Sequence, residues 1–184
     1  MRKRIQVGEL GLPMLLLLLA GLAGCVRSKG EVLVSTLPSD LRLERQGALL
    51  LRVFSDIEGS EECCDGIRDS LSSQLKERGL FSEIRTADGD EAGPVATRLE
   101  VKVVKLKKVG TMSRMFLGRH KGQARVVTEN RLYSQAGNRE LGSFIADGES
   151  SLKGVIPELS GTTKQAVKRI VEQIVAVLQQ HAGE

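Results

Sequence analysis

The chain has 184 residues, of which 27 are Lys or Arg and 23 are Asp or Glu, and its formal net charge at neutral pH is +4. Four Phe, one Tyr and no Trp are present. So few aromatic side chains argue against the stacking platforms with which proteins hold single-stranded nucleic acid or carbohydrate. We therefore expect no nucleic-acid partner.

Residues 1–24 have the three parts of a secretion signal peptide. Arg2, Lys3 and Arg4 give a basic start, an apolar core follows, and small residues precede Cys25. The apolar stretch, counted generously over residues 11–26, is shorter than the roughly 20 residues that a transmembrane helix needs. The segment is therefore expected to be a cleaved leader, not a permanent membrane span.

Leu22, Ala23, Gly24 and Cys25 resemble the lipobox of bacterial lipoproteins at every position. The resemblance implies that a peptidase recognises the three residues before Cys25 and cuts there, after the Cys25 thiol has received a diacylglycerol. The new amine would then take a further acyl chain such as palmitate, and anchoring by two or three chains is effectively permanent. Val26 is not the aspartate that retains enteric lipoproteins in the inner membrane, so the expected location is the periplasmic face of the outer membrane.

Removal of the leader would lower the net positive charge of the chain. Three basic residues and Glu9 are lost, which leaves 24 basic and 22 acidic residues, and 160 residues remain for one domain that buries its own core. The mature chain is therefore close to neutral, which removes basicity as an argument for nucleic-acid binding.

The mature chain is expected to begin with a lipidated Cys and a flexible tether over residues 25–47, in which residues 32–34 suit a short extended segment. Fully extended, such a tether would reach on the order of 70 Å at about 3.3 Å per residue. The apolar run over residues 48–54 then predicts a buried strand and the start of a domain that extends to residue 182.

A helix is predicted after Gly59, with Ser60 as its N-cap and Gly79 at its end. Its apolar positions recur at helical spacing and form one face: Cys63, Cys64, Ile67, Leu71 and Leu75. Residues 80–84 alternate like a strand, and residues 95–109 form a longer one. Between Val103 and Val104 the alternation slips by one residue, which predicts a β-bulge with Val104 and Leu106 continuing the apolar set.

Residues 123–133 predict a further strand, with Ala124, Val126, Thr128 and Leu132 on one face, and a turn at residues 135–138 leads to an antiparallel return. A closing helix is predicted near the carboxyl end from its apolar stripe: Ala166, Ile170, Ile174, Val177 and Leu178. His181 is expected in a solvated tail. The fold class is α+β, a single domain of order β-α-β-β-β-β-α whose mostly antiparallel sheet carries two amphipathic helices.

Residues 51–56, the helix with Leu71 and Leu75, and residues 78–84 resemble the strand-helix-strand opening of several envelope proteins. These are the curli-secretion lipoproteins, the peptidoglycan-synthase activator lipoproteins and the amino-terminal domain of the Tol-system β-propeller protein. The rest of the domain is similar to a lipoprotein family described as a domain of unknown function. These resemblances imply a fold and a cellular address and carry no catalytic residues.

Cys63 and Cys64 remain after Cys25 is assigned to lipid. The sequence leaves three alternatives open, which are buried unpaired thiols, a vicinal or intermolecular disulfide, and a redox or metal role. A metal site would need further ligands at suitable spacing, and the two histidines, His120 and His181, are remote in sequence. We expect no metal and no cofactor.

A basic region without any acidic residue spans residues 102–125. It contains Lys102, Lys105, Lys107, Lys108, Arg114, Arg119, His120, Lys121 and Arg125. These side chains either bind anionic groups such as lipid headgroups or lipopolysaccharide phosphates, or they are the solvated face of a strand and a loop. In the same region Met112, Met115, Phe116 and Leu117 form either a lid on the sheet or a partner-binding tip.

No catalytic constellation accompanies these features, since His120 has neither a nucleophile elbow nor an oxyanion glycine pattern beside it. We expect a non-enzymatic accessory or protein-interaction subunit of the cell envelope, anchored to the membrane through Cys25. The alternative is an anionic lipid or lipopolysaccharide binding module that uses the basic region.

Overall fold

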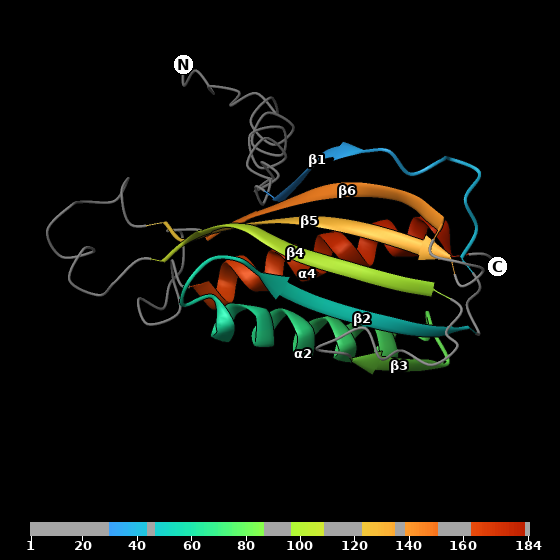
Figure 1. Ribbon diagram of the computed structural model, residues 1–184, viewed down its shortest axis with the longest axis horizontal. Coiled ribbons are helices and arrows are strands. Elements are labelled where there is room, and N and C mark those ends of the chain that lie inside the picture. Colours follow the sequence, from blue (N-terminus) through green and yellow to red (C-terminus); the bar gives the residue numbers. More distant parts are fainter. Residues whose placement is uncertain are drawn as a thin grey trace, which may run out of the picture.

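The computed structural model describes residues 30–43, 47–86, 97–108, 123–134, 139–150 and 163–182. They form one six-stranded sheet and two helices (Figure 1). In chain order the elements are β1 Gly30–Ser35, β2 Ala48–Ser55, α2 Glu61–Glu77, β3 Glu83–Thr86, β4 Thr97–Lys107, β5 Arg125–Ser134, β6 Arg139–Glu149 and α4 Thr163–His181. The predicted α+β class and the two helices are confirmed, and β1 is an additional strand at the start.

The sheet order is β1-β6-β5-β4-β2-β3. The three pairs from β1 to β4 are antiparallel, whereas β2 is parallel to both β4 and β3. Helix α2 connects β2 to β3, which is the crossover that neighbouring parallel strands require. Figure 1 shows α2 and α4 on the same face of the sheet, so no helix of the described residues lies on the other face. We call this second surface the open face.

The core lies between the sheet and the two helices. Alternate residues of the strands face it and are fully or nearly fully buried, including Leu49 and Leu51 of β2 and Leu99 and Val101 of β4. Both predicted helix stripes are buried there, that of α2 through Cys63, Cys64, Ile67, Leu71 and Leu75 and that of α4 through Ala166, Ile170, Ile174, Val177 and Leu178. The helix of residues 61–77 begins after Ser60, as predicted, but the Ser60 side chain makes no capping hydrogen bond.

The predicted bulge in β4 is present. Pairing with β5 shifts register between Val103, opposite Thr128, and Lys105, opposite Val127. The expectation that Val104 continues the apolar set is wrong, because Val104 is the extra residue of the bulge and 44% of it is exposed. Leu106 resumes the packing, opposite Val126.

The amino-terminal segment differs from the expected tether. Within residues 25–47, β1 pairs with β6, and the Thr36 amide donates to the Ser143 carbonyl at 2.8 Å. Further along, the Leu43 amide donates to the carbonyl of His181 at 2.7 Å. Backbone pairing between segments more than 100 residues apart produces no local pattern, so composition alone suggested a tether.

His181 is also placed differently from the prediction. It is the last residue of α4, half-buried, and its Nδ1 lies 3.4 Å from the carbonyl oxygen of Leu41. The helix therefore includes His181, and its end contacts the segment before β2.

A substitution at Gly148 of β6 would test how closely α4 packs on the sheet. A Cβ there would lie 2.4 Å from the carbonyl oxygen of Ala166 and 2.7 Å from Cγ1 of Ile170. Because the first contact is with backbone, Gly148→Ala should lower the free energy of unfolding by about 1–3 kcal/mol. Urea unfolding followed by circular dichroism measures it.

Gly66→Ala in α2 is the matched control, since a Cβ there meets only Val167 Cγ1 at an ordinary 3.9 Å. Replacing a helical glycine should raise stability by about 0.5–1 kcal/mol. Equal unfolding midpoints for the Gly148 variant and the wild type would contradict the close approach of α4.

Candidate functional site on the open face

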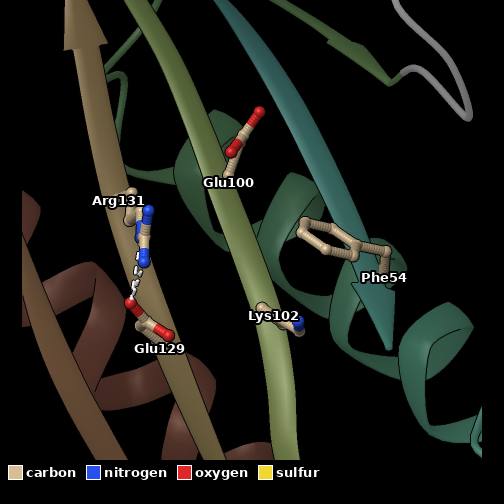
Figure 2. A pocket seen from close by; sticks show the side chains of 5 residues that line it. All are labelled: Phe54, Glu100, Lys102, Glu129 and Arg131. Atoms are coloured by element: carbon tan, nitrogen blue, oxygen red, sulfur yellow. Dashed lines mark hydrogen bonds and ion pairs between the residues drawn. The ribbon is translucent and has the colours of Figure 1, made fainter. Parts of the chain in front are cut away.

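The open face carries polar and charged side chains at the positions that alternate with the core residues. Pairing across β2, β4 and β5 brings Phe54, Lys102 and Glu129 into one row and Arg52, Glu100 and Arg131 into the next. A hollow of about 190 Å³ lies between them, lined by Phe54, Glu100, Lys102, Glu129 and Arg131 (Figure 2). We call it the open-face hollow.

Ion pairs connect the side chains around the hollow. Glu100 lies 3.8 Å from Arg52 and 3.5 Å from Arg98, and Arg131 donates to Glu129 at 2.6 Å. Lys102 pairs with Asp56 at 2.6 Å. Each carboxylate therefore lies between or beside cations, which holds the charged groups in fixed positions.

Aromatic rings add a second kind of contact. The Arg52 guanidinium lies 5.0 Å from the centre of the Phe54 ring, and the Lys102 ammonium lies 5.9 Å from it. Arg98 lies over Tyr133 at 4.3 Å. The hollow therefore combines an apolar ring with charges of both signs, which suits contact with polar groups of another molecule.

The guanidinium groups are poor candidates for acid–base chemistry. The hydrogen bond from Arg131 to Glu129 raises the pKa of Arg131 further, and the bond from Arg125 to Asp147 does the same for the pKa of Arg125. Both groups thus remain charged at neutral pH. Within the part of the chain that the structure describes, no group of three or more His, Cys, Asp or Glu side chains is arranged to hold a metal ion.

The bulge decides where the lysines of β4 lie. Because register shifts by one residue, Lys102, Lys105 and Lys107 all fall on the open face, opposite Glu129, Val127 and Arg125 respectively. We call these three the lysine row. Lys105 and Lys107 are exposed and form no ion pair with another described residue, whereas Lys102 is half-buried and paired.

The structure divides the rest of the basic region. The Lys108 ammonium donates to the carbonyl of Gly59 before α2, away from the lysine row, and Arg125 pairs with Asp147. The other predicted residues of the patch lie outside the described residues, namely Arg114, Arg119, His120 and Lys121, together with Met112, Met115, Phe116 and Leu117. The lipobox residues Leu22, Ala23, Gly24 and Cys25 also lie outside them.

Sequence reasoning missed the open-face hollow. Phe54 was assigned to a buried run, and Glu129 and Arg131 were passed over because their strand was described by its apolar parity. The sequence does contain a signal, because charged residues recur at every second position on two strands, between the apolar positions that face the core. Only the register, which the sequence does not state, shows that they meet.

Cys63 and Cys64 are both unpaired and buried. Burial raises the pKa of the Cys63 thiol to about 11, and the neighbouring Cys64 adds to the effect. Burial also raises the pKa of Cys64. The structure thus favours the first of the three alternatives, two protonated thiols packed in the core.

Comparison with known families gives the chain a place. A family described as "Domain of unknown function (DUF4410)" matches residues 32–154. The chain belongs to this family. The match begins within β1, so that the strand before residue 48 is included in the family domain. No curated protein matches the sequence.

Solved structures share the fold of this DUF4410 chain. PelC of Paraburkholderia phytofirmans, described as a dodecamer, superposes with a TM-score of 0.56 at 13% identity, over 84% of this chain and 99% of that one. Hypothetical protein CT253 of Chlamydia trachomatis superposes with a TM-score of 0.51 at 12% identity, over 74% of this chain and 97% of that one. Protein XCC0632 of Xanthomonas campestris, of family DUF330, superposes with a TM-score of 0.50 at 12% identity, over 82% of this chain and 93% of that one. At such identities the likeness shows the fold alone.

The buried thiols give a prediction that depends on pH. Since the pKa of Cys63 lies at about 11 in the folded chain, against 9.0 for an ordinary thiol, little thiolate is available at neutral pH. Iodoacetamide should label Cys63 and Cys64 far more slowly in the native than in the urea-unfolded chain. Peptide mass spectrometry at matched times measures the ratio.

The sign for stability follows from the same shift. Between pH 9.0 and about pH 11 the thiol of Cys63 loses its proton in the unfolded chain and keeps it in the folded chain. The free energy of unfolding therefore falls as pH rises through that interval. Cys63→Ser should remove part of that decrease. Equal labelling rates in native and unfolded protein would show that the thiols are accessible.

Proposed function

We propose that the chain is a lipid-anchored accessory subunit of the bacterial cell envelope that binds another envelope protein through the open-face hollow. It works at the periplasmic face of the outer membrane and catalyses no reaction. The observation that carries the proposal is the open face itself, on which an apolar ring and paired charges of both signs surround a hollow that no described helix covers.

The address rests on the amino-terminal sequence. A basic start, a short apolar core and the four lipobox residues ending in Cys25 occur in the order and at the distance from Met1 that lipoprotein export needs. No helix among the described residues is long and apolar enough to span a membrane. Acyl chains on Cys25 are therefore the means of attachment in this proposal.

The mode of action rests on chemistry and on the fold. The charged groups around the hollow form ion pairs with neighbouring side chains, so they present a defined pattern of charge. Patterns of this kind select a partner of complementary charge. PelC, which has the same fold, is described as a dodecamer, which supports assembly with other chains as a use of this fold.

Site-specific photocrosslinking tests the partner surface. Phe54 is replaced by benzoylphenylalanine in cells, and Glu172 on the exposed side of α4 is replaced in a matched control. Irradiation should produce one discrete protein adduct from the Phe54 position and none from the Glu172 position. Adducts of the same pattern from both positions, or none from Phe54, would refute a partner at the open-face hollow.

The lysine row supports a second candidate, an anionic lipid or lipopolysaccharide binding module. Lys105 and Lys107 are exposed, lie on one face and have no ion pair with another described residue. Charges of this kind attract phosphate-bearing surfaces and are screened over about 8 Å at physiological salt. The two candidates differ in what the purified protein binds, a protein or a lipid.

Neutralising the lysine row tests this candidate. Lys105→Gln with Lys107→Gln should weaken binding to phosphatidylglycerol vesicles by roughly fivefold per lysine, since each basic residue near an anionic surface contributes about 1 kcal/mol. Added salt should weaken the wild type in the same direction. Lys76→Gln, an exposed lysine of α2, is the control and should bind as the wild type does. Unchanged, salt-insensitive binding by the double variant would eliminate the candidate.

A further inference from the structure

Strand β1 presents apolar side chains to solvent at the edge of the sheet. Val32, Leu33 and Val34 are 36%, 49% and 55% exposed, and with Val104 they are the large exposed apolar residues of the described chain. β1 pairs with β6 on one side, and its other edge has no neighbouring strand among the described residues. Three consecutive exposed apolar residues on a free edge indicate a contact surface.

The position of β1 along the chain restricts what that surface can reach. Gly30, the first residue of β1, follows Cys25 by only five residues. At about 3.3–3.6 Å per residue, even a fully extended connection spans no more than roughly 18 Å. An acyl anchor on Cys25 therefore keeps the start of β1 within that distance of the membrane surface.

The charges at this end of the sheet favour the same surface. In the strand register, Gly30 of β1 lies opposite Gly148 of β6. The next residue of β6, Glu149, lies opposite Arg125 of β5, which in turn lies opposite Lys107 of β4. The start of β1 thus lies at the end of the sheet where β4 ends and β5 begins (Figure 1). Lys105 and Lys107, which form no ion pair with another described residue, are at that end and suit anionic headgroups.

We propose that the β1 edge is a membrane-contact surface, and that Val32, Leu33 and Val34 rest at the headgroup level of the bilayer in which Cys25 is anchored. This inference rests on the lipid anchor of the proposed function and adds an orientation to it. The free N–H and C=O groups of β1 need hydrogen bonds, which hydrocarbon does not supply. The strand therefore lies in the hydrated interface and does not enter the hydrocarbon layer.

The contact does not need to be strong. The short connection to Cys25 makes the second contact intramolecular, so the local concentration of lipid around β1 is high and a few half-exposed apolar side chains suffice. A strand added by another protein would bury the same residues. The anchor distinguishes the two, because it brings this edge to lipid whether or not a protein partner is present.

Tryptophan fluorescence tests the orientation, because the chain has no Trp of its own. Leu33→Trp is introduced into the lipidated chain, which is reconstituted in phosphatidylcholine–phosphatidylglycerol vesicles with or without a nitroxide quencher on the lipid headgroups. Thr86→Trp, on exposed β3 at the opposite edge of the sheet, is the matched control. Contact with the headgroup layer should shift the emission of Leu33→Trp to shorter wavelength, and the nitroxide should quench it, whereas the emission of Thr86→Trp should stay unchanged.

A second position and a flotation assay keep the outcomes apart. Val34→Trp should behave like Leu33→Trp, which covers a failure of either variant to fold. If both variants float with the vesicles and the emission of neither is quenched, the β1 contact is overturned and the anchor stands. If that unquenched emission is also shifted to shorter wavelength, the β1 edge is covered by protein and not by lipid. If the lipidated chain does not float, as expected of the Cys25→Ala control, the anchor and the contact are both overturned.

Discussion

The close approach of α4 to β6 is the constraint on which the arrangement of the domain depends. The backbone carbonyl oxygen of Ala166 in α4 lies only 2.4 Å from where a Cβ of residue 148 would be. Beside it, the Gln173 amide donates to the Asp147 carbonyl at 3.0 Å, and its oxygen accepts from the Asp147 N–H at 3.2 Å. Polar contacts thus fix α4 at the end of β6 while its apolar stripe fills the core. Since α2 packs on the same face, both described helices bury their apolar residues on one side of the sheet, and no described element forms a layer over the open face.

Relative magnitudes explain what the charges of the open face contribute. An exposed ion pair adds about 0.2–1 kcal/mol to stability, and many add nothing measurable. Removing one large core side chain such as Leu71, which is fully buried, costs about 2–5 kcal/mol. The ion pairs of Glu100 with Arg52 and Arg98 are therefore minor terms in the stability of the fold. Their main consequence is a surface with a defined pattern of charge, and that pattern bears on recognition.

The sequence predicts those parts of this fold that depend on local periodicity. Both helix stripes, the long strand, its bulge and the hairpin of β5 and β6 follow from spacing, because each buries one face. The extended segment expected at residues 32–34 is confirmed as part of β1, but its pairing does not follow from the sequence, because its apolar residues are exposed and its partners lie more than 100 positions away. The parallel pairing of β2 with β4 and the open-face hollow also depend on register between strands. The half-buried position of His181 depends on Leu41, a neighbour only in three dimensions.

Strand β1 also changes what the lipobox implies. A tether of residues 25–47 would let the domain work on the order of 70 Å from the bilayer, whereas with the proposed anchor on Cys25 the five residues to Gly30 would keep the first strand near the membrane surface. Neighbouring strands lie about 4.8 Å apart, so β4, three strands from β1, is roughly 14 Å across the sheet from that edge. The open-face hollow over β2, β4 and β5 would then lie in the layer immediately next to the membrane. A partner proposed for this surface would accordingly be a protein whose own binding region is close to the same membrane, because a protein that remains in the open periplasm would have to approach the bilayer to meet it.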